Sequence, residues 1–139
     1  MMATGGTVIL ADLDHEPAAT RDCVKRAFWA YVECALFASV HDDEPMDGIF
    51  DMGDLTDEAL GLMLSEVYDF LCDCWQADVD LSPVEPEMFG HDFWLTRNGH
   101  GAGFWDRGLG DLGLQLSDMA RAYGSSDLYV GDDGRVYVA

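Results

Sequence analysis

The sequence predicts an α+β fold, in which two N-terminal amphipathic helices are followed by a small antiparallel sheet of hairpins with a third helix. In the first half, apolar residues recur at the i, i+3, i+4, i+7 spacing of a helix that is buried on one face. In the second half, short aromatic and β-branched runs flank turn-forming residues. The 139 residues suit one domain over 1–139. We expect an acidic helical part over about 16–80 and a hairpin–helix–hairpin part over about 90–138.

The two N-terminal helices are predicted at about 16–40 and about 56–77. Pro17 suits the first turn of the first helix. Thr56 is placed to cap the second, and the two acidic residues after it suit the positive end of a helix. The apolar stripe of the first helix is Val24, Ala27, Phe28, Tyr31, Val32, Ala35 and Leu36. That of the second is Leu60, Met63, Leu64, Val67, Leu71, Cys74 and Trp75.

The second half contains two predicted hairpins around the third helix. The first joins residues 93–97 to residues 100–105, because Asn-Gly between them is typical of a two-residue turn. A helical stripe from Leu109 to Tyr123 follows and is stopped by glycine. The second hairpin joins 127–130 to 135–138. Near the N-terminus, residues 7–10 could form a short strand.

The charge balance is the feature that points to function. The chain has 27 Asp and Glu against 7 Lys and Arg, a net charge of −20. Residues 27–96 contain 17 of the carboxylates and no Lys or Arg. Such an excess repels itself and destabilises the compact state, so we expect it to serve binding to a positive partner. A merely solvated face is the plain alternative. Halophilic adaptation would spread the acids over the whole chain.

The expected partner-binding residues form two sets. The first is Glu66, Asp69 and Asp73, which lie opposite the apolar stripe of the second helix and are predicted to be in solvent. The second set lies in the loop before that helix and consists of Asp42, Asp43, Glu44, Asp47 and Asp51. Together they approach the density of duplex DNA, which carries one charge per ~1.7 Å. Such a surface would compete with nucleic acid for a site lined with Lys and Arg.

Two chemical alternatives remain open. In the first, the acidic 43–54 loop is a divalent-cation-binding regulatory module, because it matches an EF-hand at positions 1, 5, 6 and 9, which are Asp43, Asp47, Gly48 and Asp51. Pro45 at position 3 offers no side-chain ligand, and Asp54 stands at position 12 in place of glutamate.

The second alternative is a small hydrolase. Its acid–base or metal-binding set would be His91, Asp92, His100 and Asp106. The segment contains no nucleophile signature and no phosphate-binding glycine loop. We therefore predict a structural hairpin there, no catalytic residue, no metal and no cofactor.

The sequence contains no run of the ~20 apolar residues that a membrane span needs. It also has no signal-peptide pattern. Its four cysteines, Cys23, Cys34, Cys72 and Cys74, are accordingly expected to be reduced in a cytoplasm.

The last fifty residues carry a resemblance. The string from Gly90 to Gly108, the helix that ends at Gly124 and the terminal segment 127–134 together resemble a segment of many small bacteriophage-encoded proteins of unassigned function. A phage origin joined to an extremely acidic chain looks like the DNA-mimic inhibitors of host defence, which include anti-CRISPR and anti-restriction proteins. The resemblance implies a non-catalytic inhibitor in the host bacterial cytoplasm. It would block target-DNA binding by a host DNA-binding complex, with a CRISPR surveillance complex favoured, without binding nucleic acid or membrane itself.

Overall fold

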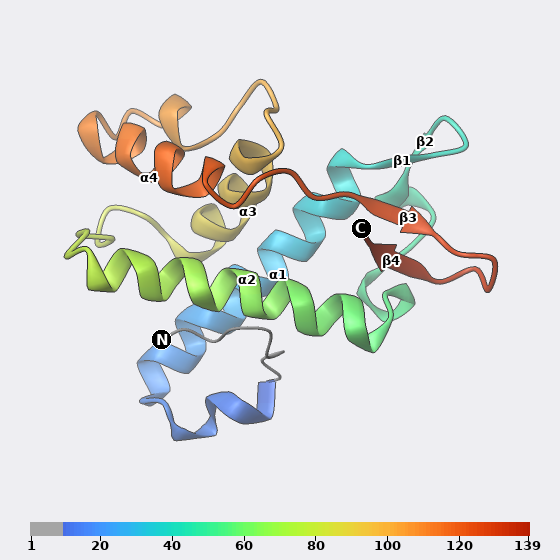
Figure 1. Cartoon of the computed structure of the whole chain (residues 1–139), viewed down its shortest axis with the longest axis horizontal. Helices are drawn as coiled ribbons and strands as arrows, with labels where there is room; N and C mark the ends of the chain where they lie inside the picture. Colours follow the sequence, from blue (N-terminus) through green and yellow to red (C-terminus); the bar gives the residue numbers. More distant parts are fainter. Residues whose placement is uncertain (1–9) are drawn as a thin grey trace.

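The structure is a computed structural model that describes residues 10–139, and it is dominated by helices (Figure 1). The helices are α1 (Ala18–Ala38), α2 (Asp57–Gln76), α3 (Pro86–Arg97) and α4 (Asp111–Arg121). Short 3-10 turns are η1 (Leu10–His15), η2 (Met46–Gly48), η3 (Met52–Asp54) and η4 (Phe104–Asp106). The strands are β1 (Val40–His41), β2 (Glu44–Pro45), β3 (Leu128–Val130) and β4 (Val136–Val138). The possible strand at residues 7–10 falls outside the described residues, except for Leu10, which begins η1.

The predicted fold class is wrong. Helices are interspersed along the described chain, and its strands form two separate antiparallel pairs rather than one sheet that follows two helices. β1 pairs with β2 directly after α1, whereas β3 pairs with β4 at the C-terminus. One reason for the error is α3, which was not predicted: its residues 93–97 stand where the first strand of a hairpin was predicted.

The prediction failed at Asn98-Gly99, which ends a helix rather than turning a hairpin. Gly99 has a φ of 71°, and its N–H donates to the carbonyl of Thr96 at 3.2 Å. The N–H of His100 reaches back to Leu95 at 3.0 Å. This pair of hydrogen bonds is the Schellman motif of a helix C-terminus. Residues 100–105 consequently form a loop and the start of η4, not a strand.

The other predicted elements are confirmed within a few residues, whereas β1 and β2 lie in or next to a segment that was predicted as a loop. α1 and α2 lie inside their predicted ranges, and Thr56 Oγ1 accepts the N–H of Ala59 at 3.0 Å as the N-cap of α2. α4 ends before Gly124, and β3–β4 is the second predicted hairpin. For these elements, the periodic spacing of apolar residues together with a capping or turn residue was enough to predict the structure.

Helix α1 lies at the centre and packs most extensively against α3, with α2 crossing it and α4 covering α3 (Figure 1). Aromatic rings fill the space between the helices: Phe70 of α2 lies 4.4 Å, centroid to centroid, from Phe93 of α3. Tyr31 of α1 stacks on Phe93 at 5.0 Å. These contacts give one continuous core.

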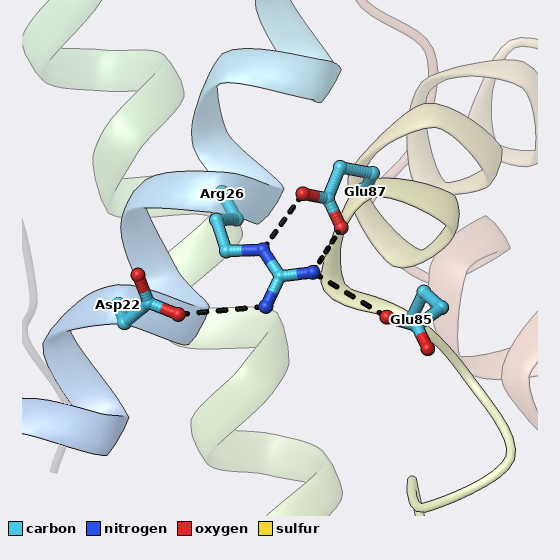
Figure 2. Close-up of polar contacts among 4 residues, drawn as sticks. All are labelled: Asp22, Arg26, Glu85 and Glu87. Carbon is cyan, nitrogen blue, oxygen red and sulfur yellow. Dashed lines mark hydrogen bonds and ion pairs between the residues drawn. The ribbon is translucent and has the colours of Figure 1, made fainter.

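Two polar contacts fix the outer elements to this core. Arg26 of α1 holds the first turn of α3 through Glu87, with which it makes two hydrogen bonds of 2.7 Å, and Figure 2 shows Asp22 and Glu85 completing the group. This hydrogen-bonded contact lowers the pKa of Glu87. At the other end of the molecule, the N–H of Thr56 donates to the carbonyl of Val136 at 3.0 Å. The C-terminal hairpin is thereby joined to the start of α2.

Candidate partner-binding surface

The structure separates the two predicted acidic sets. Glu66, Asp69 and Asp73 follow one flank of α2 toward its C-terminal end, whereas the loop acids lie near the other end of that helix (Figure 1). The expectation that all three helix acids lie in solvent is wrong for Glu66, whose side chain is only 15% exposed. The physical reason is a buried arginine from α3.

Arg97 is the centre of a buried polar network. Its guanidinium lies 2.8 Å from Glu66 Oε2 and donates to the Tyr31 hydroxyl at 2.8 Å. Burial, followed by the nearby charge of Glu66, raises the pKa of Tyr31, so its phenol stays protonated and donates to Glu66 at 2.9 Å. Arg97 also donates to the carbonyls of Gly124 and Tyr123, at 2.7 and 3.1 Å. The carboxylate of Glu66 is therefore paired inside the protein, in a network that joins α1, α2, α3 and the segment directly after α4.

The other two acids of α2 differ from each other. Asp73 is exposed but accepts a 2.6 Å hydrogen bond from the Tyr123 hydroxyl. Asp69 is half-buried between Glu66 and Asp73. Desolvation, followed by repulsion from Asp73 and Glu66, raises the pKa of Asp69. Glu66 and Asp73 therefore make hydrogen bonds within the protein, and of the three acids only Asp73 is exposed to solvent.

Replacing Asp69 by asparagine should stabilise the protein at neutral pH. A carboxylate whose folded-state pKa is raised favours folding only while it is protonated, so the wild type loses stability as pH rises through that pKa. Removing two like-charge pairs on a helix is worth about 0.5 kcal/mol. Urea unfolding should give a higher midpoint for Asp69→Asn at neutral pH, and no difference below the ordinary pKa of aspartate. A lower midpoint at neutral pH would contradict the raised pKa.

The five loop acids lie in the segment before α2 and are exposed. Asp42 and Asp43 form the exposed turn between β1 and β2, and Glu44, the first residue of β2, is exposed beside them. Asp42 and Asp43 have φ values of 51° and 67°, a left-handed conformation that aspartate tolerates better than most residues. Asp47 and Asp51 are exposed in the turns that follow. This conformation holds the carboxylates at the surface.

A groove lies beside these loop acids, between α1 and the η2–η3 segment. It has a volume of about 470 Å³. We call it the Trp29 groove. Its lining residues are Trp29, Glu33, Leu36, Asp47, Phe50, Asp51 and Met52. The β1–β2 turn adjoins it, because the His41 ring contacts Phe50 at 5.9 Å between centroids. The groove thus combines an apolar floor with three carboxylates.

Sequence reasoning missed Trp29 and Glu33. Both lie on α1 outside its predicted apolar stripe, and Trp29 remains 46% exposed. Phe37 lies two turns further along α1 and is 64% exposed. Large aromatic residues on the polar side of an amphipathic helix were the available signal, because such a face is normally polar.

In the described chain, the loop acids have no Lys or Arg partner in an ion pair, although the guanidinium of Arg135 lies beside the loop and donates to the carbonyl of Leu55 at 2.8 Å. Within residues 10–139, the acids from Asp42 to Glu58 form no ion pair with Lys or Arg, and neither does Glu33. Arg26, Arg97 and Arg107 instead pair with carboxylates of α1, α2 and α3. We call the resulting uncompensated region the acidic surface, and its members are Glu33, Asp42, Asp43, Glu44, Asp47, Asp51, Asp57 and Glu58.

The 43–54 loop does not adopt the EF-hand arrangement. Asp51 caps η3 by accepting the N–H of Gly53 at 2.9 Å, and Asp54 accepts the N–H of Asp51 at 2.9 Å. The described part of the chain has no group of three or more His, Cys, Asp or Glu side chains arranged to hold a metal ion. The cation alternative gains no support from this geometry.

The predicted His/Asp set is not brought together. Asp92 is fully buried and accepts two hydrogen bonds from Arg107, at 2.7 and 2.9 Å. His91 lies 3.3 Å from the same carboxylate. His100 lines a different cleft, beside Ser126, and Asp106 is exposed in η4. Asp92 therefore anchors the 100–107 loop to α3 instead of standing in an open acid–base site.

All four cysteines are free. Burial raises the pKa of Cys34 and of Cys74 to about 12, which makes their thiolates scarce at neutral pH and their thiols inert. In the part of the chain that the structure describes, no helix has the length and apolar character that crossing a bilayer requires.

Comparison of the chain with protein-family models, with curated proteins and with solved structures finds no match. The bacteriophage resemblance of the last fifty residues stays a prediction. Function must therefore be argued from the acidic surface and the Trp29 groove themselves.

Proposed function

We propose that this protein is a non-catalytic inhibitor of a host defence system. Its acidic surface would occupy a Lys- and Arg-rich, nucleic-acid-binding site of a host protein or complex in the bacterial cytoplasm. A CRISPR surveillance complex that recognises DNA is the favoured target, through the bacteriophage resemblance. The protein would exclude target DNA by binding in its place and would bind neither DNA nor membrane itself.

The observation that carries the proposal is the acidic surface. Eight carboxylates on α1, on the β1–β2 turn, at η2–η3 and at the start of α2 have no Lys or Arg partner in the described chain, although the same chain pairs its buried acids closely. Like charges held near one another oppose folding. A basic partner relieves that repulsion and is attracted at a high, salt-sensitive rate.

Of the α2 acids, Glu66, Asp69 and Asp73 contribute less to this surface than their spacing suggested. Glu66 is paired with Arg97, and Asp73 is bonded to Tyr123. The DNA-competing surface is therefore assigned chiefly to the loop acids and to Glu33, Asp57 and Glu58. This shifts the proposed contact from the flank of a helix to the end of the molecule that carries β1–β2.

A competition assay tests the proposal. Labelled target DNA is bound to a purified CRISPR surveillance complex, and the acidic protein is added at increasing concentration. We expect DNA to be displaced, and displacement to weaken as salt rises, because exposed charges are screened beyond ~10 Å at 0.1 M. If DNA and the protein occupy the complex together with no mutual loss of affinity, direct competition is wrong.

Neutralising the β1–β2 turn should weaken inhibition. The variant Asp42→Asn, Asp43→Asn, Glu44→Gln removes three exposed charges, and asparagine keeps the left-handed conformation at the first two positions. At about 0.5 kcal/mol for each exposed pair, the inhibitory concentration should rise roughly tenfold at low salt.

The matched control for this variant neutralises Asp118, Asp127 and Asp132, which are exposed in the C-terminal third. It changes the net charge equally and should alter the inhibitory concentration less than twofold. Equal losses in both variants would mean that overall charge, not the acidic surface, attracts the partner.

A further inference from the structure

A second hollow adjoins the Trp29 groove and shares lining residues with it. This neighbouring hollow has a volume of about 380 Å³. Trp29 and Met52 line both, and Phe28, Leu60 and Leu64 form much of the second floor. Both volumes lie in the range of clefts that take up ligands or partner side chains. The two hollows together make an apolar trough along one side of α1.

Exposed aromatic residues also lie on α1. Trp29 and Phe37 are both exposed and about 12 Å apart along the axis of α1, and Trp29 lines both hollows. Tryptophan is among the residues most enriched at the energetic centres of protein interfaces. An apolar groove flanked by charged side chains is a shape that receives the apolar face of an amphipathic helix.

The carboxylates that line the rim of the trough favour a positively charged partner helix. Glu33, Asp47 and Asp51 line the first hollow, and Asp57 lines the second, while no Lys or Arg lines either one. An occupant must therefore bring positive side chains on both sides of its apolar residues. A nucleic acid or an acidic peptide would be repelled from this rim.

We propose that the Trp29 groove and its neighbouring hollow bind a basic amphipathic helix of the partner, with apolar side chains seated against Trp29 and Lys or Arg on the carboxylate rim. The inference rests on the proposed function, because it names the element of the basic partner that the acidic surface receives. In addition, part of the binding energy comes from apolar contacts. Binding should therefore weaken less with rising salt than binding by charge attraction alone.

The test uses a labelled synthetic peptide of about 18 residues, roughly 27 Å long as a helix, with Leu and Lys at amphipathic spacing. A scrambled peptide of the same composition has no apolar face. Fluorescence anisotropy is measured with the full chain at about 0.1 M and about 0.5 M salt. We expect the amphipathic peptide to bind more tightly than the scrambled one, with the preference retained at high salt.

Trp29→Ala should lower the affinity for the amphipathic peptide at least tenfold. Trp75→Ala is the matched control, because Trp75 is similarly exposed, at 40%, at the far end of α2, and it should change the affinity less than twofold. Glu33→Gln with Asp47→Asn should weaken binding at low salt and have little effect at high salt. Urea unfolding confirms that each variant is folded.

The outcomes separate the groove from the acidic surface. Equal effects of Trp29→Ala and Trp75→Ala, or absence of peptide binding, would overturn the groove as the docking site. If both peptides bind equally at low salt and neither binds at high salt, the apolar groove is wrong while charge-driven binding stands. The DNA competition assay tests that remaining proposal separately.

Discussion

Replacing Arg97 by methionine is expected to destabilise the protein by about 3–5 kcal/mol, because removing one partner of a buried ion pair leaves the other charge uncompensated. Glu66 would lose its ion pair, and the carbonyls of Tyr123 and Gly124 would lose their donor. A loss of this size is a large part of the 5–15 kcal/mol that stabilises a typical domain. Urea unfolding at neutral pH measures it.

A double-mutant cycle with Glu66→Gln tests whether the destabilisation of Arg97→Met comes from the lost ion pair with Glu66. The double variant should lose less than the sum of the two single variants, with a coupling of at least about 1 kcal/mol. The same cycle with the exposed pair Arg121 and Asp118, 3.9 Å apart, should give a coupling near zero. A loss below about 1 kcal/mol for Arg97→Met would mean that this network does not hold the helices together.

This network also changes how a charge reversal on α2 must be interpreted. Lysine at position 66 would place a second positive charge beside Arg97, which is buried. Such a variant would lose inhibition by unfolding, not by losing contact with a partner. Charge variants intended to test function therefore belong on the β1–β2 turn.

Replacing Gly90 by alanine is the second change with a large expected effect. A Cβ at position 90 would lie 1.9 Å from the carbonyl oxygen of Ala27. The obstacle is the backbone of α1, which cannot rotate away as a side chain can, so α3 would have to move off its largest interface. Overpacking costs 1–3 kcal/mol when a core adjusts and more when it does not, so we expect about 3 kcal/mol or loss of folding.

Gly101→Ala is the control for this prediction, because a Cβ there meets nothing within 4 Å. It should change the free energy of unfolding by less than about 0.5 kcal/mol. The comparison is made by urea unfolding and by the recovery of folded protein after expression. If Gly90→Ala were as stable as the control, α1 and α3 could not lie as close as the structure places them.

Local sequence signals predicted α1, α2, α4 and the β3–β4 hairpin, but they missed β1–β2 and failed decisively at α3. α1, α2 and α4 follow their apolar periodicity, and Thr56 caps α2 as its side chain suggests. Asn98-Gly99 supplies a positive φ in a hairpin and at a helix end alike. The packing of Phe89 and Phe93 against Phe70 favours the helix, and that contact joins residues about twenty positions apart, which no local pattern reports.

The candidate site divides in the same way. The sequence by itself determined that residues 27–96 contain 17 carboxylates without a Lys or Arg, and that the loop before the second helix would be acidic. Only the tertiary structure decided which carboxylates are free to meet a partner. Glu66 and Asp47 were both predicted to bind the partner, yet Glu66 pairs with Arg97 and Asp47 lines the Trp29 groove. A carboxylate's exposure and pairing depend on groups that folding brings to it from distant segments, and periodicity along one helix contains no information about them.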